Sequence, residues 1–437
     1  MRHSQIQWRR ACVGAAAAVL LSVPVAAGSA YGVTAPPTPS PSATASSSPS
    51  ASSDTGFAQL DPAVAARLDT AVKQVMREAN VPGVSVSLSA PGKGNYVRSF
   101  GVADKATGTP MTPNLYMRIG SETKTFTVTA MLELVDQGKL GLDDPIGKYI
   151  PGVPNGDKIT LRQLAEMRSG LFNYSEDSAF GKAMLSDPKK SFTPRQLLDY
   201  SFKHPVLFQP GKEFLYCNTN LILLGLVIEK ASGQPLNEYI AQKVLKPAGL
   251  THTSFPTDAA FPSPHAQGYT NQTLSGKVEV TTDWNPSWAW AAGAMISDLS
   301  DLKSWAHTVA TGTLLSAKTQ AERLKTIPST IPGAGYGVGI FNIQGWIGHN
   351  GSLPGYESLT VYLPEAKATL VVLINTDMLH GKSEPTTLFG QAITKIVTPG
   401  HVFNIPVVEP HVSPGRRLVQ RPRIGVVLLR GAPGQRV

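Results

Sequence analysis

Hydrophobic and polar positions follow regular patterns near the start of the main body of the chain. Residues 61–62 (Asp-Pro) are a good helix start, and apolar side chains follow them at helical spacing up to Val75. Residues 84–88 then alternate apolar side chains with serines, and a Pro/Gly turn at 91–94 leads to a second such segment through Val97. The pattern predicts an N-terminal helix followed by a β-hairpin.

A second group of β-forming segments lies near the other end of the chain. Residues 359–363 and 369–375 are rich in aliphatic and β-branched side chains, a turn at 364–367 separates them, and a helix is expected over 384–397. The middle of the chain, 120–310, has mostly helical patterns. These features predict the α+β class: one antiparallel β-sheet closed by both termini and flanked by helices, with an inserted all-helical region.

The first 56 residues differ in composition from the rest. Three arginines precede an apolar run at 11–25 and a group of small residues, the order typical of a secretory signal peptide, which we assign to residues 1–30. An uncleaved membrane anchor is the alternative. Residues 31–56 are rich in Pro, Ser, Thr and Ala and are expected to form a disordered linker. A single folded domain is predicted at 57–400, in a protein that is secreted or held in the cell envelope.

Charge is distributed unevenly along the 437 residues. Of the formal net charge of +9, residues 1–30 contribute +3 and residues 401–437 contribute +5, so the stretch between them is almost neutral. We therefore interpret 401–437 as a basic, poorly ordered tail and expect no nucleic-acid partner.

The overall composition is that of a soluble globular protein. Apolar residues make up 42% and charged residues 16%, and no other stretch is long and apolar enough to span a bilayer. We expect no stable membrane span after signal cleavage, and a monomer. Of the two cysteines, only Cys217 remains after removal of residues 1–30, so no internal disulfide is expected.

The first of three motifs with candidate chemistry is Ser-Glu-Thr-Lys at 121–124. The segment that follows is apolar on several sides, which predicts a buried helix with Ser121 at its N-terminus and Lys124 on the same face. Burial would favour the neutral amine that a base requires. A capping serine beside a solvated lysine is the alternative. The same spacing recurs at 186–189 and 300–303, so spacing alone does not identify a site.

The other two motifs are Tyr-Cys-Asn at 216–218, before a predicted buried helix, and His-Asn-Gly at 349–351. We expect the latter to open a strand that runs into the 359–363 segment. The tyrosine could carry a proton and the asparagine could hold a substrate amide, while backbone N–H groups of Ser121 and Ser352 could hold an oxyanion. Taken singly, these residues are more typical of a packed tyrosine, a capping asparagine and a structural histidine.

In this order and context the motifs resemble those of the penicillin-recognising serine hydrolases. That family includes serine D-Ala-D-Ala carboxypeptidases, class C β-lactamases, and related esterases and D-aminopeptidases. The similarity covers residues 60–397, and His-x-Gly in place of Lys-Thr-Gly is most similar to the secreted carboxypeptidase branch. Further matching segments are 118–121, 134–140, 159–164, 168–171, 218–220 and 292–297.

The resemblance implies a β-lactamase/transpeptidase-like fold and an acyl-enzyme mechanism that needs no metal and no organic cofactor. Ser121 would attack a carbonyl, Lys124 and Tyr216 would share the proton transfers, and which of the two is the base stays open. The implied oxyanion hole consists of the N–H groups of Ser121 and Ser352. The implied catalytic residues are Ser121, Lys124, Tyr216, Asn218 and His349. The implied substrate-binding residues are Phe172, Ser175, Trp288, Asn350 and Gly351.

Two positions depart from the family pattern. Phe341 stands where the carboxypeptidase branch has an arginine that binds the terminal carboxylate of its substrate. Cys217 stands where Ser or Ala is usual, either as a small buried filler or as an oxidation point. We therefore expect a serine hydrolase acting on a small molecule or peptide. The activity that the resemblance favours is that of a D-Ala-D-Ala carboxypeptidase-like peptidase acting on cell-wall peptides. An esterase or β-lactamase of the same fold is one alternative. A catalytically silent protein that binds penicillin or wall fragments is the other.

Overall fold

The computed structural model describes residues 56–328 and 333–405. The predicted signal peptide, almost all of the predicted linker, and the chain beyond 405 lie outside the described residues. The segment 401–405 is described, and it packs on the body, because Phe403 is fully buried. The body therefore extends at least to Ile405, five residues past the predicted boundary.

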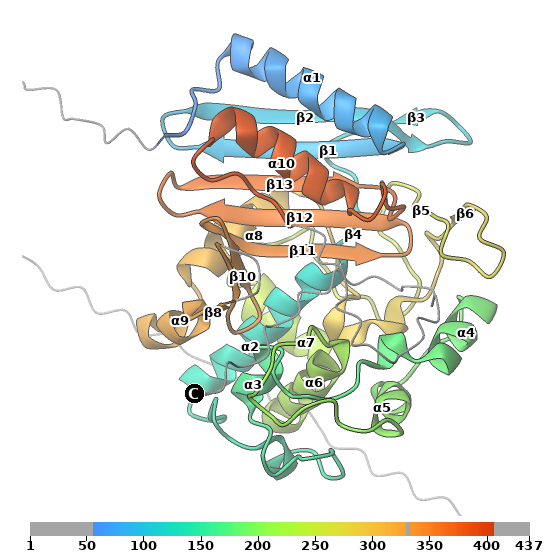
Figure 1. The fold of residues 1–437 in the computed structure, drawn as a ribbon, viewed down its shortest axis with the longest axis vertical. Coiled ribbons are helices and arrows are strands. Elements are labelled where there is room, and N and C mark those ends of the chain that lie inside the picture. Colours follow the sequence, from blue (N-terminus) through green and yellow to red (C-terminus); the bar gives the residue numbers. More distant parts are fainter. Residues whose placement is uncertain (1–55, 329–332, 406–437) are drawn as a thin grey trace, which may run out of the picture. The chain divides into compact units, whose positions relative to one another are not determined.

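A nine-stranded antiparallel sheet forms the centre of this body (Figure 1). Strand β1 pairs with β13, so the N-terminal and C-terminal parts of the body close one sheet, as predicted. In sheet order the strands are β3 (Thr109–Pro110), β2 (Gly94–Asp104), β1 (Gly83–Ala90), β13 (Ala368–Ile374), β12 (Tyr356–Leu363), β11 (Trp346–Leu353), β10 (Phe341–Ile343), β9 (Ala334–Tyr336) and β8 (Ile327–Pro328).

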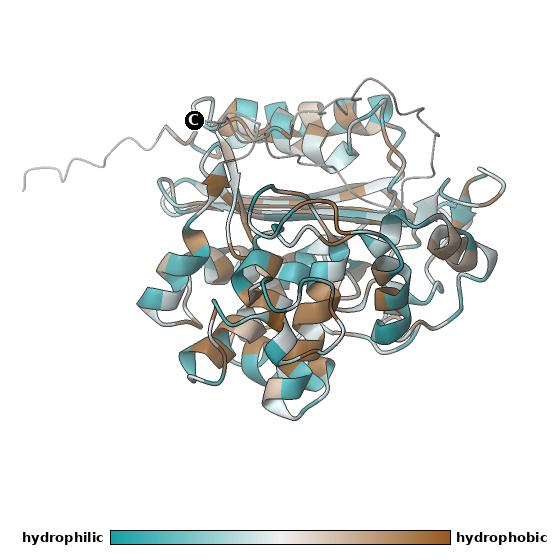
Figure 2. Cartoon of the chain, turned by 60° about the horizontal axis from the view of Figure 1, so that its bottom comes forward, coloured by the Kyte–Doolittle hydropathy of each residue, from teal (hydrophilic) through white to brown (hydrophobic). Residues whose placement is uncertain are grey.

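Two helices cover one face of the sheet. They are α1 (Pro62–Glu78) and α10 (Pro385–Val397), which contact each other; α10 lies in front of the strands in Figure 1, and the helices on this face lie above the sheet in the turned view of Figure 2. Asp61 caps α1 by accepting a hydrogen bond from the Val64 N–H at 2.8 Å. The predicted N-terminal helix and the predicted C-terminal helix are both confirmed.

The helical region covers the other face. Its two central helices, α2 (Thr123–Asp136) and α6 (Asn218–Ser232), pack on each other and are buried on nearly all sides. The fold is thus the predicted α+β arrangement with an inserted helical region. The remaining helices are α3 (Leu161–Ala165), α4 (Ser178–Ser186), α5 (Pro194–Phe202), α7 (Leu236–Ile240), α8 (Leu299–Thr311) and α9 (Ala317–Leu324). Two pairs of two-residue strands complete it: β4 (Met117–Arg118) with β7 (Ile296–Ser297), and β5 (Tyr269–Thr270) with β6 (Glu279–Val280).

One predicted element is wrong. The His-Asn-Gly motif does not open a strand that continues into 359–363; it lies inside β11, which ends at Leu353. Gly355, with a φ of 94°, makes the turn that reverses the chain, and Asn350 then pairs with Leu359 across antiparallel strands.

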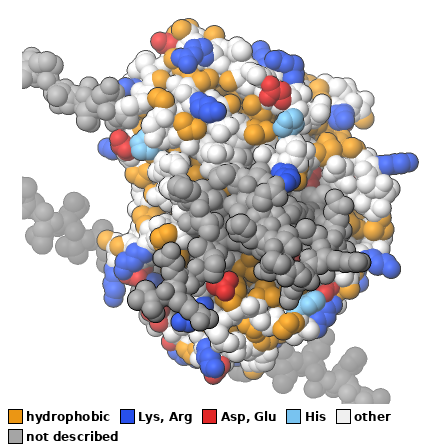
Figure 3. Space-filling model, in the orientation of Figure 1, with side chains coloured by type: hydrophobic (Ala, Val, Ile, Leu, Met, Phe, Trp, Pro, Cys, Tyr) orange, Lys and Arg blue, Asp and Glu red, His pale blue; other side chains and the backbone are white. Residues whose placement is uncertain are grey.

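The described helices give no sign of a transmembrane segment, since none is both long enough and apolar enough to cross a bilayer. On the face in Figure 3, Lys and Arg side chains are scattered around the periphery with acidic side chains between them. The described part of that face therefore presents no continuous basic patch.

Candidate active site

Ser121 lies in a short 3₁₀ turn, Gly120–Glu122, that leads directly into α2. The Lys124 Nζ donates a hydrogen bond of 2.8 Å to Ser121 Oγ and another of 2.8 Å to the Ala292 carbonyl. Lys124 has no exposed surface, and this burial holds the pKa of its amine well below the usual value. A neutral amine on the serine hydroxyl is what activation of a nucleophile requires.

The two other Ser-x-x-Lys pairs have different surroundings. Ser186 and Ser300 are exposed. Lys189 forms an ion pair with Asp283, and Lys303 donates to Asn95 Oδ1 at 3.4 Å. Only the 121–124 pair, among the three, joins its serine and lysine in a buried site.

Tyr216 lies just before α6 and faces the same pair. Its ring centroid is 4.8 Å from Lys124 Nζ, and its buried hydroxyl has no hydrogen-bond partner in the described part of the chain. Burial raises the pKa of Tyr216 well above its usual value, although the Ser121 side chain is near enough to act on that pKa in the opposite direction. Tyr216 therefore stays protonated at neutral pH, next to Ser121.

His349 contacts this group from β11, with its ring centroid 6.1 Å from that of Tyr216. Its Nδ1 donates to the Asn350 carbonyl at 2.5 Å, and its Nε2 accepts from the Tyr336 hydroxyl at 3.0 Å. Burial, with the nearby Lys124 amine as a second cause, lowers the pKa of His349 to about 3. The imidazole is thus neutral, and its nearest hydroxyl partner is Tyr336.

The glycines of the first and third motifs bring two backbones into contact. A Cβ on Gly351 would lie 1.9 Å from the Ile119 carbonyl, and a Cβ on Gly120 would lie 2.7 Å from the Ser352 nitrogen. Only glycine fits at these positions. The close approach places the backbone at Ser352 beside that of Ser121, as the predicted oxyanion hole requires.

Asn218 is held by two side chains that lie behind it. Its Nδ2 donates to Ser175 Oγ at 3.1 Å, its backbone N–H donates to Asn173 Oδ1 at 3.1 Å, and Ser175 Oγ in turn donates to Asn173 Oδ1 at 3.0 Å. The buried Asn218 Oδ1 has no partner within the described residues. This oxygen is the acceptor that remains available to a ligand.

A pocket opens beside Ser121, and we call it the serine pocket. None of its lining residues is charged, so it suits a neutral or aromatic group. It is lined by Gly120, Ser121, Tyr174, Asn218, Trp288, Ala289, Ala292, Gly293, Ser352 and Leu353.

The predicted substrate-binding residues are only partly at this pocket. Trp288 lines it, and Ser175 acts behind Asn218. Phe172 is not among the lining residues; its ring stacks on His204 with centroids 3.8 Å apart. Asn350 points elsewhere and donates to Glu384 Oε2 at 2.7 Å, and Gly351 has the backbone role described above.

Comparison with known proteins places this geometry in a family. The sequence matches the family described as Beta-lactamase over residues 68–389. The chain belongs to the Beta-lactamase family. It is therefore a serine hydrolase of that family.

Solved structures of relatives agree with this assignment to the Beta-lactamase family. A D-stereospecific amidohydrolase from Streptomyces sp. is 31% identical, with a TM-score of 0.68 over 76% of this chain and 98% of that chain. The D-amino acid amidase from Ochrobactrum anthropi SV3, complexed with L-phenylalanine, is 30% identical, with a TM-score of 0.66 over 76% and 98%.

Curated relatives are longer than the matched region. Protein flp of Staphylococcus aureus (strain COL) is 30% identical over 324 residues, which cover 71% of this chain and 62% of that protein. The putative penicillin-binding protein PbpX of Bacillus subtilis (strain 168) is 29% identical, over 64% and 66%. The chain thus spans less than two thirds of the length of Protein flp.

Sequence reasoning missed three residues of this Beta-lactamase family site: Tyr174, Asn173 and Tyr336. Tyr174 lines the serine pocket and donates to the Trp288 carbonyl at 2.6 Å. The Asn-Tyr pair at 173–174, which follows the family-matching segment 168–171 after one intervening residue, was a signal for both positions. For Tyr336, the signal was its place between two glycines, Gly335 and Gly337, which indicates a closely packed backbone. The structure agrees, because a Cβ on Gly337 would lie 2.4 Å from the Arg323 carbonyl oxygen.

Two further side-chain groups bear on the chemistry. Cys217 is fully buried and burial raises the pKa of its thiol to about 12, which agrees with a filler and disfavours a reactive thiolate. His252, Asp298 and Asp301 place one ligand atom each within 4.8 Å of one another and could hold a metal. None of these three lines the serine pocket.

Proposed function

We propose that the chain hydrolyses amide or ester bonds of D-amino-acid derivatives, including short cell-wall peptides, through an acyl-enzyme on Ser121. The observation that carries this proposal is the buried Lys124 amine on Ser121 Oγ, at the edge of an uncharged pocket lined by two aromatic side chains. The printed descriptions of two relatives, a D-stereospecific amidohydrolase and a D-amino acid amidase, support the D-configured substrate class.

In the first half-reaction, neutral Lys124 takes the Ser121 Oγ proton while Oγ bonds to the substrate carbonyl carbon. The backbone N–H groups of Ser121 and Ser352 stabilise the resulting oxyanion. Asn218 Oδ1, which lacks a protein partner, accepts from an N–H of the substrate.

The carbon–nitrogen or carbon–oxygen bond then breaks, and the leaving group receives a proton from the Tyr216 hydroxyl, which the Lys124 ammonium replenishes. In the second half-reaction water attacks the ester carbonyl carbon and gives one proton to Lys124. The bond from that carbon to Ser121 Oγ then breaks, Lys124 returns the proton to Oγ, and the acid product leaves. This division of roles follows the directions of the pKa shifts, since the Lys124 pKa is lowered and the Tyr216 pKa is raised. We therefore propose Lys124 as the base and Tyr216 as the proton carrier.

A substrate panel tests the proposed function. Wild type and Ser121→Ala are incubated with D- and L-phenylalanine amide, D-Ala-D-Ala, a 4-nitrophenyl ester, a chromogenic cephalosporin and a fluorescent penicillin. We expect turnover of the D-amide that depends on Ser121 and exceeds turnover of the L-amide at least tenfold. Equal turnover of both enantiomers would overturn the D-specific proposal, and penicillin labelling without any turnover would support a binding protein instead.

We also propose that the mature protein is exported, on the basis of the N-terminal sequence order alone. Expression in a bacterial host with a Sec pathway, followed by N-terminal mass analysis of protein from the medium, tests this. Protein that stays inside the cells with residues 1–30 attached would contradict it.

A further inference from the structure

Arg118 is a buried cation at the end of β4, three residues before Ser121. Its side chain is 2% exposed, and no acidic side chain forms an ion pair with it in the described part of the chain. Burial lowers its pKa to about 10, with Tyr356 and Asp258 acting in the opposite direction, so the guanidinium is still charged at neutral pH. A buried charge without a partner is costly, and such positions are often compensated by a ligand.

Among the described residues, the protein binds the guanidinium through Nη2. This nitrogen donates to the carbonyls of Thr282 and Trp284, each at 3.2 Å, and to that of Ala259 at 3.5 Å, while the guanidinium carbon lies 4.8 Å from the Phe261 ring centroid. The buried Nη1 has no partner among the described residues. Two strong donors on that atom are therefore free to bind an acceptor.

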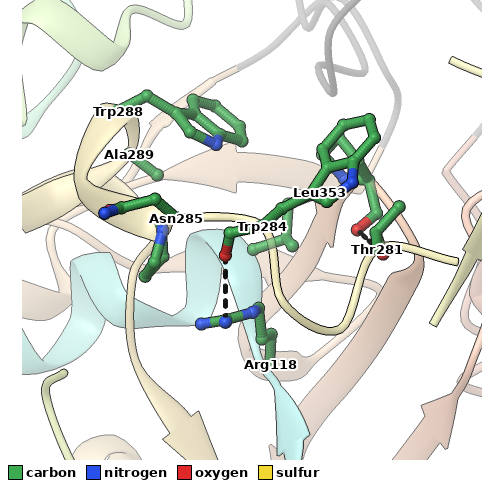
Figure 4. Close-up of a pocket in the computed structure, with 9 residues that line it drawn as sticks. Arg118, Thr281, Trp284, Asn285, Trp288, Ala289 and Leu353 are labelled. Atoms are coloured by element: carbon green, nitrogen blue, oxygen red, sulfur yellow. Dashed lines mark hydrogen bonds between the residues drawn. The ribbon is translucent and has the colours of Figure 1, made fainter. Parts of the chain in front are cut away.

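A second pocket leads to this arginine. We call it the arginine pocket, and in Figure 4 Arg118 lies beneath the segment that carries Trp284 and Asn285. The arginine pocket and the serine pocket share Trp288, Ala289 and Leu353 in their walls. Each pocket has an accessible volume of about 10 Å³, room for one small polar group, and the shared wall sets the two pockets side by side.

We propose that the arginine pocket binds a carboxylate of the substrate, which accepts hydrogen bonds from Arg118 Nη1 while the scissile carbonyl lies at Ser121. The proposal rests on the proposed function, and it narrows the substrate class to D-amino-acid derivatives that carry a free carboxylate. Phe341, which stands in place of an arginine on β10, lies elsewhere: its ring packs on His349, with centroids 5.4 Å apart. The cation of this site therefore comes from β4.

The test uses the full-length protein and two substrate pairs that differ only in a carboxylate against a carboxamide. N-succinyl and N-succinamoyl D-phenylalanine 4-nitroanilide place the group on the acyl side, and D-Phe-D-Ala and its C-terminal amide place it on the leaving-group side. In one of the two pairs the carboxylate should reach the arginine pocket. For that pair we expect the wild-type KM to be about tenfold lower for the carboxylate substrate than for its carboxamide counterpart, which is the effect expected of one charge-assisted hydrogen bond. Arg118→Met should bring the two KM values within about twofold, and Arg118→Lys should lie between.

Because each ratio is measured on one protein preparation, partial unfolding of a variant does not change it. Arg323→Met is the matched control. Arg323 is also buried and, within the described residues, also forms no ion pair with an acidic side chain. It donates hydrogen bonds to Thr125 and Thr129 of α2 and lines neither pocket. Its acid-to-amide ratio should equal that of wild type. An Arg118→Met protein that keeps the wild-type ratio in both pairs would overturn the proposal, as would a wild type without any preference.

A binding measurement separates this proposal from the proposed function. Calorimetry of Ser121→Ala needs no turnover, and it uses N-succinyl-D-phenylalanine amide and D-Phe-D-Ala, each beside its carboxamide counterpart. Tighter binding of the acid in one pair, lost in Ser121→Ala/Arg118→Met, would support the carboxylate site even if no substrate were hydrolysed. Equal binding of acid and carboxamide in both pairs would contradict it even if the enzyme were active.

Discussion

At the scale of single residues, Lys124 and Lys303 each follow a serine by three positions, yet their surroundings give them different chemistry. Lys303 lies at the surface of α8, whereas Lys124 is buried between α2 and the segment that contains Ala292. The difference comes from desolvation, which a spacing pattern does not report. Burial converts a common surface residue into a candidate base.

Lys124→Met should lower kcat/KM by about 10² to 10⁴, the usual contribution of a general base. Since the active form needs the neutral amine, kcat/KM of wild type should fall as the pH is lowered through the depressed Lys124 pKa. A pH–rate series on wild type and Lys124→Met checks this, and circular dichroism verifies that the variant is folded. A variant that retained both the activity and the acid limb would exclude Lys124 as the base.

His349 should not titrate in the physiological range, because its pKa is near 3. We expect side-chain ¹⁵N NMR between pH 5 and 8 to show one neutral tautomer, protonated at Nδ1 and accepting at Nε2 from Tyr336. In Tyr336→Phe the Nε2 resonance should shift, because its donor is lost. Titration of the His349 ring near pH 6.5 would contradict the neutral assignment.

At the scale of elements, the site depends on one strand meeting one turn. Strand β11 carries His349 and Ser352, and it lies against the 3₁₀ turn that carries Ser121. At this crossing there is no room for a side chain, because a Cβ on Gly351 would lie 1.9 Å from the Ile119 carbonyl oxygen. The geometry of the oxyanion hole is thus set by backbone packing more than by any polar side chain.

Gly351→Ala should separate β11 from the Ser121 turn, because its new Cβ would overlap the Ile119 carbonyl. We expect kcat to fall by about 10² or more, as when one oxyanion donor is lost, and the free energy of unfolding to fall by about 1–3 kcal/mol. Gly400→Ala is the control, since no atom lies within 4 Å of a Cβ there. Equal kcat values for the two variants would argue against the backbone role.

Strands and motifs were not equally predictable from the sequence. The hairpin at 83–104 and the helix α10 were predictable because period and turn residues are local signals. The position of His349 inside β11 was not predictable. In the sequence, Gly355 cannot be distinguished from a glycine in any loop, and its role as the turn between β11 and β12 becomes clear only once their pairing is known. The pocket walls depend on contacts between distant segments. The sequence pattern therefore did not single out Tyr174, and Phe172, expected to bind substrate, is not among the lining residues and stacks on His204.

At the scale of the whole molecule, the described body is closed by its two ends. The Ala58 N–H donates to the Val397 carbonyl at 2.8 Å, and Phe403 packs beside Gly390 of α10 and Phe341 of β10. The composition gave no sign of this last contact, because a single apolar side chain at the start of a basic segment is easily assigned to the tail. Its burial shows that the body includes residues beyond 400.

Phe403→Ala should destabilise the protein by about 3–5 kcal/mol, the usual cost of removing a fully buried aromatic side chain. Leu274→Ala, at a position that is 66% exposed, should change the free energy of unfolding by less than about 0.5 kcal/mol. Denaturant unfolding of the two variants and wild type measures both. If Phe403→Ala were as stable as Leu274→Ala, the 401–405 segment would not be part of the folded body.

The central claim is that substrate is hydrolysed through an ester on Ser121. Wild-type protein is mixed with N-acetyl-D-phenylalanine methyl ester, quenched in acid within the first turnover, digested and examined by mass spectrometry. The account predicts an N-acetyl-phenylalanyl adduct on the peptide that contains Ser121, and no adduct in Ser121→Ala. An adduct on another residue, or turnover of the ester by Ser121→Ala at the wild-type rate, would contradict it.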